Sequence, residues 1–132
     1  MTTTRLLAAS LALTTALMAQ AADGLIAVKS PHAPAETMNR LEAKVKERGL
    51  NVFARIDHAA GAAKVGKTLR PTELLIFGNP QGGTALMLAS PTVAIDLPMK
   101  AWAWEDSSGR VWLTYNASQL LQERHGLPEE FA

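Results

Sequence analysis

Residues 74–97 read LLIFGNPQGGTALMLASPTVAIDL, and this stretch decides the fold that the sequence predicts. It opens with four apolar residues, Leu74–Phe77, which are bounded by Gly78 and Pro80. An unbroken apolar run of this kind is typical of a strand that is covered on both faces. After two adjacent glycines we expect a short apolar helix and then a second strand that carries Asp96. Other elements of the chain should therefore pack on each side of the first strand.

The first 21 residues have the pattern of an export signal. Arg5 is their only charged residue, residues 6–18 are nearly all apolar or threonine, and Ala19-Gln20-Ala21 matches the small-x-small cleavage pattern. A membrane anchor is the competing interpretation, but a helix that spans a bilayer needs about 20 apolar residues, and this run is shorter. We therefore expect a removed signal peptide, a mature single domain of residues 22–132 without a membrane span, and a periplasmic or secreted protein.

Charge and cysteine content narrow the possible partners and chemistry. The 13 Lys and Arg residues include Arg5, so the chain beyond the signal balances its 12 acidic residues. A neutral domain has no charge excess with which to attract nucleic acid or an anionic membrane, so we expect no nucleic-acid partner. The absence of cysteine excludes disulfides and thiol catalysis.

The remaining segments predict an α+β domain. We expect strands near residues 25–29, 51–56, 100–105 and 110–115, and helices near residues 35–48, 58–65 and 117–125. The first of these helices carries an apolar stripe of Met38, Leu41 and Val45. Because hairpin connections dominate the second half of the chain, the expected fold class is a two-layer domain in which a mostly antiparallel sheet carries helices on one face.

The two strands nearest the C-terminus should form a hairpin across Asp106-Ser107-Ser108-Gly109, a loop that suits a type I turn with Gly109 in the left-handed region. In that register Trp102, Trp104 and Trp112 share one face. The other face carries Ala101, Ala103, Val111, Leu113 and Tyr115. Neither face is polar, although a sheet with helices on one side normally shows water a polar face. We therefore expect a second subunit to cover the exposed face, which makes the protein a homodimer.

Several short motifs, spread over nearly all of the chain after the signal, carry a resemblance to a known family. They are Ile56-Asp57-His58-Ala59-Ala60, Phe77-Gly78-Asn79-Pro80, Gly83-Thr84, Leu97-Pro98 with Lys100, Trp104-Glu105-Asp106, Gly109, Val111-Trp112 and Tyr115-Asn116. In these motifs the sequence resembles the domain-of-unknown-function family numbered 302. The resemblance implies a two-layer α+β fold similar to the TATA-binding-protein type, in the order strand, helix, four strands, helix, and assembly as a homodimer. It implies no activity, and DNA binding does not transfer with the fold, because that function needs a basic surface.

Asp57-His58 is the first candidate site. His58 could act as a metal ligand or a general base, with Asp57 or another acid orienting its ring. In the alternative interpretation Asp57 caps the following helix and His58 makes a structural hydrogen bond, since one histidine alone is not a metal site. His125 also has a structural explanation, because the helix dipole favours an imidazolium in the last turn of a helix.

The loop of residues 79–84 is the second candidate site. Paired glycines ahead of a helix can present free N–H groups to an anion, so Asn79, Gly82, Gly83 and Thr84 are candidate ligand-binding residues. A tight turn in which Thr84 caps the helix explains the same residues without a ligand.

Asp96, on the predicted second strand, is the third candidate. Its side chain points either inward, where a carboxylate needs a partner, or outward to water.

Two hypotheses follow from the three candidates. One is an exported homodimeric module that binds a small ligand or has a structural role. The other is a small hydrolase or metal-dependent enzyme centred on His58, with Asp57 and Asp96 as supporting acids. The sequence identifies no cofactor, and the positions of His58, Asp96 and His125 relative to one another decide whether the second hypothesis has a site.

Overall fold

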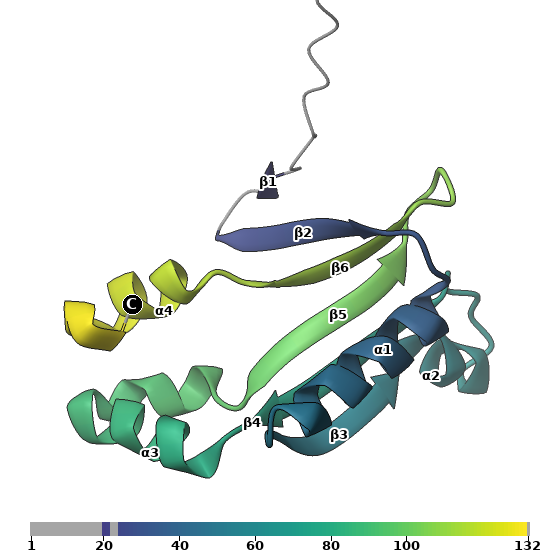
Figure 1. The fold of residues 1–132 in the computed structure, drawn as a ribbon. Coiled ribbons are helices and arrows are strands. Elements are labelled where there is room, and N and C mark those ends of the chain that lie inside the picture. The colour runs from purple at the N-terminus through teal and green to yellow at the C-terminus, as the bar shows by residue number, and fades with distance from the viewer. Residues whose placement is uncertain (1–19, 22–23, 132) are drawn as a thin grey trace, which may run out of the picture.

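The computed structural model describes residues 20–21 and 24–131, which form one antiparallel sheet with helices (Figure 1). The strands are β1 (Gln20–Ala21), β2 (Leu25–Ser30), β3 (Asn51–Asp57), β4 (Thr72–Gly78), β5 (Met99–Glu105) and β6 (Val111–Asn116). They lie in the order β1-β2-β6-β5-β4-β3, and every neighbouring pair is antiparallel. Residues 1–19 of the predicted signal peptide lie outside the described residues.

The helices are α1 (Pro34–Glu47), α2 (His58–Lys64), α3 (Pro80–Ala89) and α4 (Ser118–His125), with the 3-10 helices η1 (Pro91–Asp96) and η2 (Glu129–Phe131). Figure 1 shows α1 lying across the sheet, α3 and α4 beyond one end of it, and α2 toward the other end. Sheet and helices together confirm the predicted α+β class. Among the described residues, each helix is too short or too polar to cross a membrane.

The hydrophobic core lies between α1 and the sheet. α1 packs across β3, β4, β5 and β6. Its predicted stripe buries Met38 and Val45 against Leu75 of β4 and Ala103 of β5, and Met38, Leu75 and Ala103 are each 0% exposed. Full burial of side chains from a helix and two strands fixes α1 on this face of the sheet.

The predicted register of the C-terminal hairpin is confirmed. Trp104 pairs with Trp112, Trp102 pairs with Thr114, and Gly109 has a φ of 78°. The three tryptophans therefore share the face of the sheet opposite α1, where the rings of Trp102 and Trp104 stack with their centroids 4.7 Å apart. Nε1 of Trp104 donates a hydrogen bond to Thr114 Oγ1 at 2.9 Å. We call this surface of β3 to β6 the tryptophan face.

The sequence predicted that other elements would cover both faces of the first strand of the 74–97 stretch, but only one face is covered in this way. α1 buries Leu75, but Leu74 and Ile76 on the tryptophan face are only partly buried. Leu74 pairs with Trp102 on β5. Leu74–Phe77 are all apolar because they contribute to two apolar surfaces, the core and the tryptophan face. Among the described helices α1 packs across the sheet, and it covers only the core side.

The second strand expected in this stretch does not form either. Pro91–Asp96 is the 3-10 helix η1, which Pro91 begins. Proline lacks the N–H that a strand ladder requires, and its fixed φ suits the first position of a helix. The chain therefore turns back beyond the end of the sheet before it enters β5, and Asp96 lies at this turn and not on a strand.

Candidate functional site

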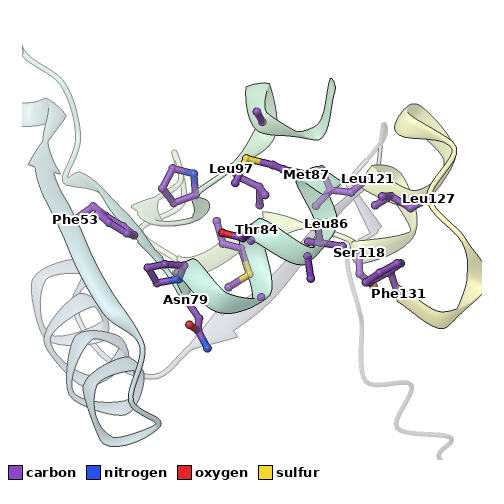
Figure 2. Close-up of a pocket in the computed structure, with 18 residues that line it drawn as sticks. Phe53, Asn79, Thr84, Leu86, Met87, Leu97, Ser118, Leu121, Leu127 and Phe131 are labelled. Atoms are coloured by element: carbon purple, nitrogen blue, oxygen red, sulfur yellow. The ribbon is translucent and has the colours of Figure 1, made fainter. Parts of the chain in front are cut away.

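A cavity of about 640 Å³ lies beyond the end of the sheet, where α3, η1 and the C-terminal segment meet (Figure 2). Its apolar wall includes Leu86 and Met87 of α3, Leu97 after η1, Leu121 of α4, and Leu127 and Phe131 beyond α4. Figure 2 shows the side chains of α3 and of the C-terminal segment facing one another, with Phe53 contributed separately by β3. No lining residue is charged, and the polar side chains in the lining are those of Asn79, Thr84 and Ser118.

The helix that forms most of this wall begins earlier than expected. Asn79 is its N-cap, and the side-chain oxygen of Asn79 accepts a hydrogen bond from Gln81 N at 3.0 Å. Pro80 occupies the first helical position, where a missing N–H costs nothing. The prediction that Thr84 caps the helix is therefore wrong, since Asn79 does so five residues earlier. Gly82 and Gly83 are not a turn but part of the first helical turns.

The two helical glycines have no conformational reason to be glycine. Neither has a positive φ. A Cβ on Gly82 would meet nothing within 4 Å, and one on Gly83 would lie 3.8 Å from Leu97 and 4.0 Å from Met87, which are ordinary contacts. Glycine inside a helix costs about 1 kcal/mol relative to alanine. Because these two residues have no side chain, the backbone of α3 is uncovered where it lines the cavity, and another molecule could approach it closely.

The residues predicted as a ligand-binding loop lie together in this cavity. Asn79, Gly82, Gly83 and Thr84 all line it. The opposite wall was not predictable from the sequence, because it comes from α4 and η2, about 40 residues further along the chain. The anion-binding interpretation of the glycine pair has no support in the lining, which holds no cationic side chain.

Asp57 and His58 lie at the other end of the sheet. Asp57 is the N-cap of α2, and its Oδ1 accepts from Ala60 N at 2.9 Å, which is the structural role that the sequence allowed for it. His58 is exposed in the first turn of α2. In the described part of the chain, no group of three or more His, Cys, Asp or Glu side chains could hold a metal ion.

Asp96 lies with His125 and not with His58. The Asp96 carboxylate accepts hydrogen bonds from Arg124 Nη1 at 3.2 and 3.3 Å and from His125 Nε2 at 2.5 Å. Because a carboxylate only accepts, Nε2 of His125 carries the hydrogen. Nδ1 of the same ring lies 2.8 Å from Thr92 Oγ1, and Ser90 Oγ donates to the carbonyl oxygen of His125 at 2.8 Å. We call these five residues the Asp96 cluster.

The Asp96 cluster joins η1 to the last turn of α4, next to the cavity. The side chain of His125 is only 4% exposed. Thr92, Asp96 and His125 do not line the cavity themselves, but Ala94 and Leu97 beside Asp96 and Leu127 beyond His125 do. The sequence pattern points to Asp96 and His125 but not to Ser90, Thr92 or Arg124, because only the observed turn of η1 brings residues 90–96 to the last turn of α4.

The chain is similar in fold to a solved protein and in sequence to longer proteins. The solved structure is that of an uncharacterised conserved DUF302 protein from Bacillus stearothermophilus. The superposition covers 82% of this chain and 84% of that one, with a TM-score of 0.73 and 20% sequence identity. Two proteins named fluoride-specific ion channel FluC 1, from Brucella suis biovar 1 and Brucella abortus biovar 1, are each 56% identical to it over 104 residues. The match covers 79% of this chain but only 41% and 38% of those proteins, so the chain spans about two fifths of their length.

The name of the Brucella proteins describes chains that are more than twice as long as the region they share with this one. The family model that matches here is the domain of unknown function DUF302, and it matches residues 26–132. This range includes every strand except β1 and the first residue of β2, and all of the cavity and the Asp96 cluster. The protein therefore belongs to the DUF302 family.

Proposed function

We propose that this domain binds a neutral, largely apolar small molecule in the cavity between α3 and α4. The observation that carries the proposal is a hollow of about 640 Å³ whose lining contains no charged side chain. Cavities of roughly 300–1,000 Å³ with mostly apolar walls and a few polar groups are typical of small-molecule sites. The bare backbone at Gly82 and Gly83 adds a surface on which a flat or elongated molecule can lie.

The lining also favours a class of ligand. A charged group placed among these side chains would lose its hydration without gaining a counter-ion, which is costly. Asn79, Thr84 and Ser118 offer hydrogen bonds to a ligand with one or two neutral polar groups. The expected ligand is therefore an uncharged molecule with a hydroxyl, carbonyl or ether group on an apolar body.

The neutral fluorescent probe N-phenyl-1-naphthylamine tests this proposal. Its emission should rise and saturate with the wild-type protein, and the Gly83→Leu variant should lose most of that binding because the added side chain fills the cavity. Gly61→Leu is the matched control, since Gly61 is also a helical glycine, but it lies on α2, away from the cavity, and a Cβ there would meet nothing within 4 Å. Equal binding by all three proteins, or none by wild type, would contradict the proposal.

We further propose that the domain is exported to the periplasm or secreted, and that it works as a homodimer. The signal-like pattern of residues 1–21 supports export. The tryptophan face supports the dimer, because large apolar patches on soluble proteins are normally covered by a partner and a two-fold arrangement is the simplest way to do so. N-terminal sequencing of the mature protein tests the first point, with Ala22 as the expected first residue.

Light scattering tests the dimer, and two exposed apolar residues on opposite faces provide a matched pair. Ile56 lies on the tryptophan face, since it pairs with Leu74, whereas Val28 lies on the α1 side, since it pairs with Leu113. They are 38% and 48% exposed. The wild-type protein and Val28→Lys should have about twice the chain mass, and Ile56→Lys should fall to the monomer mass, because a lysine in a closed apolar interface leaves an unpaired charge. A monomeric wild-type protein would exclude the dimer.

One observation favours a second candidate function, an ester hydrolase centred on His125 and not on His58. Thr92 Oγ1, the His125 ring and Asp96 follow the order of nucleophile, base and orienting acid, within hydrogen-bond reach of one another. It ranks second because none of the three lines the cavity. Hydrolysis of p-nitrophenyl acetate that is lost in Thr92→Val and retained in Thr92→Ser would support it. Equal rates for Thr92→Val and wild type would exclude it.

A further inference from the structure

α4 and η2 form one wall of the cavity, yet they have few attachments to the rest of the domain. α4 packs chiefly on η1, and neither α3 nor α4 contains a fully buried residue. Figure 1 shows α4 continuing beyond the end of β6 instead of lying across the sheet. Figure 2 shows Leu121 and Leu127 facing α3 across the hollow. Leu127 of this wall is only 7% exposed, but among the described residues the core between α1 and the sheet includes no side chain from α4 or η2.

Specific contacts hold α4 at its two ends. At the start of the helix, Ala117 N donates to the carbonyl oxygen of Gly24 at 2.8 Å. Gly24 has a φ of 77°, and a Cβ there would lie 3.1 Å from the side chain of Leu120, so the chain ahead of β2 passes closely over the first turn of α4. At the end of the helix, the Asp96 cluster attaches Arg124 and His125 to η1.

The two attachments differ in kind. The contact with Gly24 is made by backbone next to β6 and continues the pairing of β2 with β6, in which Leu25 pairs with Asn116. The Asp96 cluster is made almost entirely of side chains, and it joins two short segments that have no strand pairing between them. The side-chain contact is the one that can break while the fold persists, and its loss would let α4 swing about residues 116–117.

We propose that the Asp96 cluster is a latch that holds α4 closed over the cavity and sets the rate at which the ligand enters and leaves. This inference rests on the proposed function, because it concerns the regulation of the same cavity. The buried imidazole of His125 is its central piece. Its Nε2 is bonded to Asp96 and its Nδ1 to Thr92, so both nitrogens hold residues of η1, and opening would expose both to water. Ligand exchange requires that these bonds be broken and then made again.

A disulfide that can be formed and reduced tests the latch within a single variant. The chain has no cysteine, so a Thr92→Cys/His125→Cys double variant carries a single possible disulfide between two positions whose side chains already touch. In the reduced form the latch bonds through the imidazole are absent, and in the oxidised form a covalent bond replaces them. Dissociation of N-phenyl-1-naphthylamine, followed by stopped flow, should be at least about tenfold slower from the oxidised than from the reduced form, since each tenfold corresponds to about 1.4 kcal/mol of barrier. Equal rates in the two forms would overturn the proposal.

A second variant serves if the disulfide does not form. Asp96→Asn keeps the shape of the side chain but weakens the bonds to Arg124 and His125, and it should release the probe several-fold faster than wild type. Glu123→Gln removes a neighbouring charge on α4 that bonds only to Gln119 among the described hydrogen bonds, and it should release the probe at the wild-type rate. Identical rates for Asp96→Asn and wild type would contradict the latch.

Hydrogen exchange of the α4 amides separates failure of the latch from failure of the proposed function. Protection of residues 118–125, without any ligand, should fall in Asp96→Asn and in the reduced double variant, and it should be restored on oxidation. If wild type fails to bind the probe while protection still follows this order, the ligand proposal is wrong and the latch holds α4 for another purpose. Unchanged α4 protection in every variant would overturn the latch itself.

Discussion

Two regions of this domain are built differently, although they share one sheet. The α1 end is the sheet with α1 packed across it and the turns opposite the cavity, and the cavity end is formed by α3, η1 and α4. At the α1 end, Met38 and Leu75 are 0% exposed and the core is closed. At the end formed by α3 and α4, η1 buries Val93 fully, but neither α3 nor α4 contains a buried residue, and the space between them is a cavity. Packed cores stabilise a fold, whereas apolar hollows lose contacts and gain the capacity to bind. In this domain, different residues can therefore carry stability and the proposed binding.

The ion pairs of the two ends are arranged in opposite senses. At the α1 end a cation is central: Arg55 donates to Glu73 at 3.0 Å and to Glu42 at 3.3 Å, and it contacts Asn39 at 2.7 Å. The hydrogen bond to Glu73 is the main reason that the pKa of Arg55 lies above its ordinary value. At the cavity end a carboxylate is central, and its partners Arg124 and His125 both come from α4. The first arrangement ties two strands to a helix, whereas the second ties only two short helices.

Truncating the core should have the largest effect on the free energy of unfolding, and it tests directly whether the two ends differ in this way. Met38→Ala leaves a cavity under α1 and should lower the free energy of unfolding by about 2–5 kcal/mol. Leu88→Ala, on α3, removes a side chain that is 82% exposed and should change it by no more than about 0.5 kcal/mol. Urea unfolding followed by circular dichroism measures both. Losses of similar size would show that the two ends do not differ in this way.

Replacing helical glycines at the two ends should have a smaller effect on the free energy of unfolding, and of opposite sign. Gly82→Ala and Gly61→Ala should each raise the free energy of unfolding by about 0.5–1 kcal/mol, because alanine favours helix and a Cβ meets nothing at either position. Only Gly82→Ala should also weaken binding of the fluorescent probe, since Gly61 is outside the cavity. If probe binding were equally strong in both variants, the bare backbone of α3 would have no role in binding.

The smallest effect on stability should come from the turn of residues 106–109, which lies at the end of the sheet opposite the cavity, and this effect should depend on pH. Asp106 accepts hydrogen bonds from Trp112 Nε1, from the backbone of Arg110 and Ser108, and from the Arg110 side chain, and these bonds lower its pKa to about 2. The unfolded value is about 3.9, so the contribution of Asp106 to stability is complete above about pH 4 and is lost as the pH falls toward 2.

The Asp106→Asn variant should therefore be less stable than wild type at pH 6 and should approach it as the pH falls to 2. Thermal unfolding across this range measures the difference. Glu36→Gln is the control, because its exposed pair with Arg40 should contribute little at any pH. A difference between Asp106→Asn and wild type that stays constant with pH would mean that the turn does not depend on the ionised carboxylate.

The sequence predicted the α1 end well, for local reasons. The stripe of Met38 and Val45 follows helical spacing, and the alternation around Trp104 and Trp112 follows strand spacing with Gly109 as a fixed point. Each pattern is complete within one or two neighbouring elements. The same local logic explains why the cap at Asp57 was predictable as an alternative to a catalytic role.

The cavity end was only half predictable. The sequence predicts a binding candidate at residues 79–84, but a helix capped by Thr84 would begin too late, and the predicted strand at Asp96 does not form. Both errors have one cause, because prolines at positions 80 and 91 each begin a helix, where the paired glycines suggested a turn and the apolar residues around Asp96 suggested a strand. The Asp96 cluster joins residues about 30 positions apart, and no local pattern predicts such a contact.

The stacked pair of Trp102 and Trp104 has a practical consequence for anyone who studies this protein by spectroscopy. All three tryptophans of the chain lie on β5 and β6, and none lines the cavity. Rings with centroids 4.7 Å apart and planes inclined by 12° are close enough for their excited states to couple. Intrinsic emission and near-ultraviolet circular dichroism will therefore respond to events on the tryptophan face, such as dissociation of the proposed dimer, and will stay largely silent when a molecule occupies the cavity.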